Sequence, residues 1–69
     1  MQLTAVLIPA EECGFIALNP ETGTTTQGES IETALANLQE ATALYLEEFS
    51  VISYGKPLIT TFEVSAHAA

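Results

Sequence analysis

The sequence predicts an α+β domain of two layers, with one helix packed on one sheet, in the order β-β-β-α-β. Three observations favour this fold: short strand-like runs separated by turn residues, one long segment of helical periodicity, and a final alternating run. The chain has 69 residues, of which 48% are hydrophobic, so a folded core is feasible. We therefore expect a single domain over residues 1–69.

The first two strands are expected to form a hairpin. Residues 3–8 carry apolar side chains on both faces, which indicates a central strand. Pro9 should end this strand because it has no N–H to donate to the sheet. Residues 10–14 then form the hairpin loop, with Gly14 at the position that needs a positive φ. Residues 15–18 are the return strand.

The third strand is expected to lie at a sheet edge. Residues 19–23 include asparagine, proline and glycine, which are typical of a turn. The polar, threonine-rich residues 24–27 that follow favour an exposed edge strand, and Gly28 closes it.

The helix is the clearest element of the sequence. Ser30 is the expected N-cap, and Glu32 is favourable near the positive end of the helix dipole. The predicted core stripe follows the helical period on one face and comprises Ile31, Ala34, Leu35, Leu38, Ala41, Thr42, Tyr45 and Phe49. Leu44 lies outside this stripe.

The last strand is expected over residues 58–64, after a connection at 50–57. Its two faces alternate, with Leu58, Thr60, Phe62 and Val64 on one and Ile59, Thr61 and Glu63 on the other. A right-handed crossover from the helix would place it beside the first strand and parallel to it. Residues 65–69 are expected to be a frayed tail.

The charge balance is strongly acidic. The chain has nine glutamates, no aspartate, no arginine and one lysine, which gives a net charge of −8. This charge repels nucleic-acid phosphates and fits a basic protein partner. The alternative interpretation is that acidity serves solubility alone.

The sequence offers no constellation for catalysis or for metal binding. Cys13 and His67 are the only cysteine and histidine, and His67 lies in the tail. Metal-dependent hydrolysis needs several converging carboxylates, and the spacing of the glutamates does not predict such a cluster. We therefore expect no enzyme activity, no catalytic residue, no metal and no cofactor.

The start of the chain lacks the basic region of a signal peptide, and no apolar run reaches the length of a membrane span. The expectation is a cytoplasmic protein with no membrane partner.

Several segments together resemble the HicB antitoxin family. The opening LTAV, the acidic hairpin loop EE, and GFIALNPE are similar to the start of these proteins. The most specific stretch is TQGESIE, which continues into ALANLQEA and LYLEE. The resemblance covers residues 1–50 closely and the last strand loosely.

This resemblance implies an antitoxin that binds a HicA-like toxin, a small basic ribonuclease, and masks its active site. It also implies a partly degraded RNase H-like fold. Many HicB proteins add a C-terminal DNA-binding domain, which we do not expect here because the sequence ends at Ala69. Direct nucleic-acid binding by this chain is therefore not expected. The alternative is an orphan HicB-fold module that binds or assembles without a toxin.

The candidate partner-binding residues are acidic and lie in loops or at the helix end. Helix-terminal glutamates are unfavourable to the helix dipole, which points to a role in binding a cationic partner. The candidates are Glu11, Glu12, Glu21, Glu47 and Glu48.

A domain with so short a core and no internal disulfide is expected to gain stability as a homodimer or higher homo-oligomer. Leu44 is the candidate interface residue because it lies off the core stripe.

Overall fold

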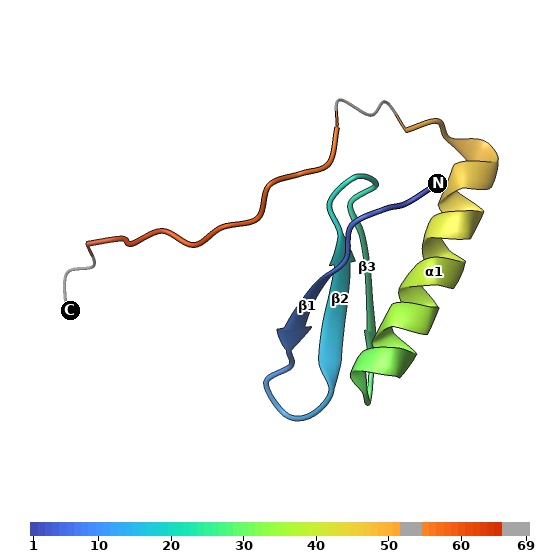
Figure 1. The fold of residues 1–69 in the computed structure, drawn as a ribbon. Helices are drawn as coiled ribbons and strands as arrows, with labels where there is room; N and C mark the ends of the chain where they lie inside the picture. Colours follow the sequence, from blue (N-terminus) through green and yellow to red (C-terminus); the bar gives the residue numbers. More distant parts are fainter. Residues whose placement is uncertain (52–54, 66–69) are drawn as a thin grey trace.

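A computed structural model describes residues 1–51 and 55–65 of the chain (Figure 1). This part folds into the strands β1 (Val6–Pro9), β2 (Phe15–Asn19) and β3 (Thr24–Gly28), followed by the helix α1 (Ile31–Glu48). The predicted α+β class and the β-β-β-α order are confirmed. Residues 52–54 of the predicted connection and 66–69 of the predicted tail lie outside the described residues.

The sheet is antiparallel, and within the described residues its order is β1-β2-β3. Leu7 is opposite Ala17, and Ala17 is opposite Thr26, so these residues share the face that α1 covers. The prediction that the first strand is central is wrong, because β1 is an edge strand and β2 lies at the centre. The outer side of β1 has no neighbour because no later segment in the described residues joins the sheet.

The predicted fourth strand over residues 58–64 is not formed in the described part of the chain. This segment, the C-terminal arm, extends away from the sheet and the helix (Figure 1). Leu58 is 92% exposed and Phe62 is 84% exposed. Alternation predicts an extended backbone, but a strand also needs a pairing edge, and that requirement is not local.

Two glycines set the geometry of the end of the sheet where the β1–β2 hairpin lies. Gly14 has a φ of 83°, as the sequence predicts. Gly28 lies directly beneath the first turn of α1, where a Cβ would meet the backbone of Thr33 and Ala34. The absence of a side chain at Gly28 therefore lets α1 approach the end of β3 closely.

The helix begins as predicted. Ser30 is the N-cap, and its hydroxyl oxygen accepts a hydrogen bond from the Thr33 N–H at 3.1 Å. The Ser30 hydroxyl also donates a hydrogen bond to Thr33 Oγ1 at 3.0 Å, so the two side chains are hydrogen-bonded to each other at the helix start. At the other end, the Phe49 N–H donates to the Tyr45 carbonyl at 2.9 Å.

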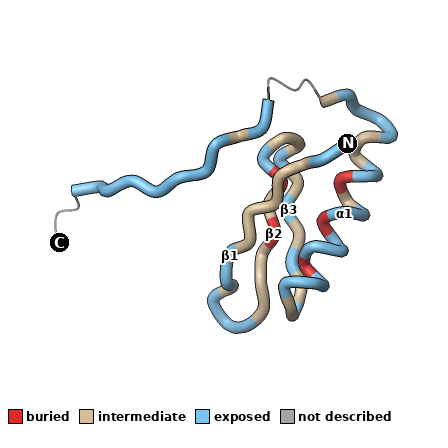
Figure 2. The backbone as a smooth tube through the Cα atoms, viewed as in Figure 1, coloured by how far each residue is buried: buried red, intermediate tan, exposed pale blue. Residues whose placement is uncertain are grey.

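The core is small and lies between α1 and the sheet (Figure 2). Within the described residues, its buried apolar members are Ala17, Ala34 and Leu38. Thr42 is also buried, and its hydroxyl donates to the Leu38 carbonyl at 2.8 Å. The ends of the predicted stripe are open to solvent, since Ile31 is 43% exposed and Phe49 is 54% exposed. Leu35, another member of the predicted stripe, is also exposed, so the buried part of the helix face is the narrow row of Ala34, Leu38 and Thr42.

Candidate protein-binding surfaces

A buried polar network fixes the start of the chain to the turn between β2 and β3. Asn19 is fully buried. Its Nδ2 donates to the Thr4 carbonyl at 2.7 Å and to Glu21 Oε1 at 2.6 Å. Its Oδ1 accepts from the Thr22 N–H at 2.8 Å and from the Thr22 hydroxyl at 2.6 Å. The side chain of Asn19 is therefore satisfied, and it joins residues distant in the sequence.

Glu21 belongs to this network rather than to a free surface. Its carboxylate accepts hydrogen bonds from the Thr4 N–H and the Thr4 hydroxyl, each at 2.9 Å. The hydrogen bond from the backbone N–H of Thr4 is the main cause that lowers the pKa of the Glu21 carboxyl. Partial burial raises this pKa, and the hydrogen bonds from the Thr4 hydroxyl and the Asn19 amide lower it further. A carboxylate held in this way is less available to a partner than an exposed one.

Replacing Glu21 with glutamine should give a stability loss that depends on pH. A folded-state pKa below the ordinary 4.5 means that ionised Glu21 stabilises the fold above that pH. This contribution is lost as the pH falls through the lowered pKa. The difference in unfolding free energy between wild type and Glu21→Gln should thus be constant near neutral pH and shrink in acid.

Urea unfolding across a pH series measures this difference. Glu40→Gln, which removes the same charge from an exposed helix position, corrects for the general effect of net charge. A Glu21→Gln difference that grows towards low pH would contradict the assignment.

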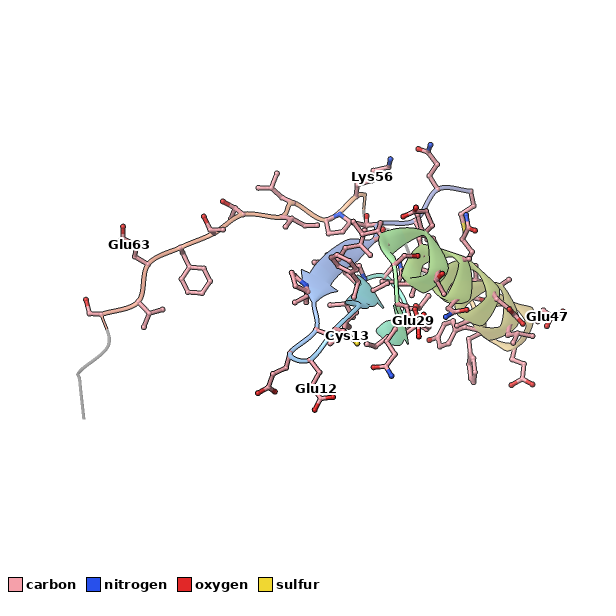
Figure 3. All side chains as sticks on the ribbon, turned by 90° about the horizontal axis from the view of Figure 1, so that it is seen from below. Glu12, Cys13, Glu29, Glu47, Lys56 and Glu63 are labelled. Carbon is pink, nitrogen blue, oxygen red and sulfur yellow. The ribbon has the colours of Figure 1, made fainter. Side chains whose placement is uncertain are left out.

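The first acidic surface, the hairpin end, lies where β1 turns into β2. Glu11 and Glu12 are exposed in the loop. Glu29 lies on the same side of the domain as Glu12 and Cys13 (Figure 3). These three residues line a hollow of about 430 Å³. The hairpin end therefore combines acidic side chains from two separate segments.

Sequence reasoning missed Glu29 as a member of this surface. The strand register supplies the reason for its position: Phe15 pairs with Gly28, so the residues one step further out, Gly14 and Glu29, also come together. The signal was present in the two predicted strands, but their relative register could not be fixed without the turn between them.

The second acidic surface, the helix end, contains Glu47 and Glu48. Both residues are exposed in the last turn of α1, which has no basic residue. The end of α1 and the β1–β2 loop lie at opposite ends of the domain (Figure 1), and Figure 3 shows Glu47 and Glu12 apart from each other on these two elements. The structure thus divides the predicted acidic candidates between two separate surfaces, with Glu21 held in the polar network.

An open groove of about 520 Å³ runs between the N-terminal segment and α1. Leu3 and Ala5 form one wall, and Leu35, Leu38 and Leu46 form the other. The groove lies where α1, which packs over β2 and β3, passes the segment that precedes β1 (Figure 1). Leu44, the predicted interface residue, is 60% exposed and does not line this groove.

No group of three or more histidine, cysteine, aspartate or glutamate side chains that could hold a metal occurs within residues 1–51 and 55–65. Cys13 is a free, exposed thiol, and His67 lies outside the described residues. Among the helices of the described part, none is long and apolar enough to cross a membrane.

Comparison with known proteins finds no family model that matches the chain, and no match among curated proteins or solved structures.

Proposed function

We propose that this protein is a HicB-like antitoxin that neutralises a small, basic, RNA-cleaving toxin of the HicA type by covering its active site. The chain itself carries out no chemistry in this proposal. The observation that carries it is the strongly acidic surface, since the chain has nine glutamates and one lysine. The resemblance of residues 1–50 to the HicB family supports the same proposal.

The placement of the charges supports a cationic partner. Glu11, Glu12, Glu47 and Glu48 are all exposed, and none of them makes a hydrogen bond or ion pair in the described part of the chain. The lysine does not neutralise either acidic surface, because Lys56 Nζ donates to Gln2 Oε1 at 2.9 Å. Unpaired carboxylates at a surface create a negative field that attracts a basic protein.

The mechanism is steric occlusion assisted by charge. The field of the chain raises the rate of encounter and orients the toxin. Contact at short range then blocks access of RNA to the toxin, and the same negative charge repels the RNA backbone. The hairpin end and the helix end are the two alternative contact surfaces, because the β1–β2 loop and the end of α1 lie at opposite ends of the domain (Figure 1).

Co-purification tests the proposal. A tagged chain is expressed together with the product of the adjacent reading frame, which should encode a small, basic protein with a histidine. We expect a stable complex that survives size-exclusion chromatography. Failure of the two proteins to associate, with both folded, would instead favour an orphan binding module.

Charge reversal distinguishes the helix end from general acidity. Changing Glu47 and Glu48 to lysine should slow association with the toxin by about tenfold or more at low salt. The fold should remain intact, because lysine suits the negative end of the helix dipole. Stopped-flow or surface-based kinetics measures the rate, and circular dichroism checks the fold.

The matched control is Glu40→Lys combined with Glu63→Lys, which changes net charge equally at exposed positions elsewhere. Raising salt should slow association much more than it speeds dissociation, since screening acts over about 8 Å at physiological ionic strength. Equal rates for both double variants would exclude the helix end as the contact surface. Rates insensitive to salt would mean that the acidity serves solubility.

A further inference from the structure

The C-terminal arm has the pattern of a strand but no strand to pair with. Leu58, Phe62 and Val64 share one face of an extended backbone and are 92%, 84% and 72% exposed. In the described residues the arm makes no hydrogen bond to the sheet or to α1. Large apolar side chains in this alternation are typical of a strand buried on one face.

The domain lacks a strand at the position that such an arm would fill. The outer edge of β1 is unpaired within the described residues. The other edge is partly satisfied by the helix, because Asn37 Nδ2 donates to the Gln27 carbonyl of β3 at 2.8 Å. The groove lies just before β1, between residues 1–5 and α1. Leu3, Leu35 and Leu46 are among its lining residues, so a strand that continues past the start of β1 would meet apolar side chains on both walls.

The opposite face of the sheet is also uncovered. The strand register places Val6, Ile8, Ile16 and Leu18 on the face away from α1, and Ile8 is 45% exposed. A strand added at β1 would widen the sheet and place its second face, with Ile59, beside this apolar surface.

The arm points away from its own groove. Lys56 is held at the N-terminal segment by its hydrogen bond to Gln2, and after Pro57 the chain continues outward (Figures 1 and 3). The radius of gyration is 14.3 Å, whereas a compact domain of this length has about 11 Å. The chain therefore has an open groove with apolar side chains on both walls, and an arm whose apolar face is exposed to solvent.

We propose that two copies of this chain exchange their C-terminal arms. The arm of each copy adds as a strand to the outer edge of β1 in the other and inserts the Leu58–Phe62 face into the groove between the N-terminal segment and α1. A second copy is the occupant that we favour, because the arm of each chain extends away from its own groove (Figure 1). A two-fold pair then brings one arm to each groove. This dimer does not depend on toxin binding.

Sedimentation of the wild-type chain gives the first measurement. We expect a dimer across the micromolar range, with the amide protons of residues 58–64 protected from exchange. Phe62→Glu should raise the dimer dissociation constant by roughly two orders of magnitude, since it places a charge in a buried apolar contact at both interfaces. Thr61→Glu, on the other arm face, is the control and should retain the dimer.

Mixing two defective variants separates exchange from closure within one chain. Phe62→Glu damages the arm, and Leu35→Glu damages the groove. In an exchanged pair, the intact arm of the second variant fills the intact groove of the first, so the mixture should form heterodimers even if each variant alone is monomeric or unfolded.

Closure of each arm onto its own domain gives no such rescue, because every molecule then contains one damaged part. A monomeric wild type, or a mixture in which no heterodimer forms, would overturn the proposal. A wild-type dimer that Phe62→Glu leaves unchanged would also overturn it.

Discussion

Replacing Asn19 with leucine should destabilise the fold by about 3–5 kcal/mol, because the buried partners of its amide lose their hydrogen bonds. The Thr22 N–H and the Thr4 carbonyl would be left unsatisfied, and the ionised Glu21 would lose a donor. A domain of this length is stable by only about 3–10 kcal/mol. The loss is a large fraction of this stability, so the melting temperature and the urea midpoint should fall steeply.

Thermal and urea unfolding followed by circular dichroism measures the loss. Asn37→Leu is the matched control, because Asn37 is exposed and has a single hydrogen bond, to Gln27. It should cost about 1 kcal/mol or less. An Asn19→Leu variant as stable as Asn37→Leu would show that the network does not hold the N-terminal segment in place.

Gly28→Ala is expected to cost about 2–4 kcal/mol, and the reason is steric. The added Cβ would contact Ala34 N and lie 2.8 Å from the Thr33 carbonyl carbon. Both are backbone atoms in the first turn of α1, so the helix would have to move away from β3. The small core formed by Ala17, Ala34 and Leu38 has little further contact with which to compensate.

The control for Gly28→Ala is Gly23→Ala, which measures the cost of a strained backbone conformation without any steric clash of the added Cβ. Gly23 has a φ of 75°, but a Cβ there has no atom within 4 Å. Its cost should be about 1–2 kcal/mol from the left-handed conformation alone. Urea midpoints of the two variants give the comparison, and a larger loss at Gly23 would contradict the close approach of α1 to β3.

Features determined by neighbouring residues could be predicted from the sequence. The cap at Ser30 and the positive φ of Gly14 depend on groups within a few positions, and both are confirmed. The predicted core stripe contains residues that are exposed in the structure, including Ile31 and Phe49 at its two ends. Their exposure depends on how much of the helix face the sheet covers. Helical periodicity contains no information about that extent.

Features that depend on pairing between distant segments could not be predicted. The alternation at Leu58–Val64 correctly indicates an extended chain, but the choice of partner edge is non-local. The grouping of Glu12 with Glu29 has the same origin, because it follows from the register of β2 against β3. Charge counts predicted an acidic surface without showing that it is divided between two ends of the domain.

The central proposal is that this chain inhibits an RNA-cleaving toxin and does not cleave RNA itself. The most direct measurement is RNA cleavage by the purified toxin during titration with this protein. We expect cleavage to fall to background at a fixed molar ratio, and the protein alone to leave RNA intact with Mg²⁺ or Mn²⁺. Cleavage that continues unchanged in excess of the folded protein would contradict the claim.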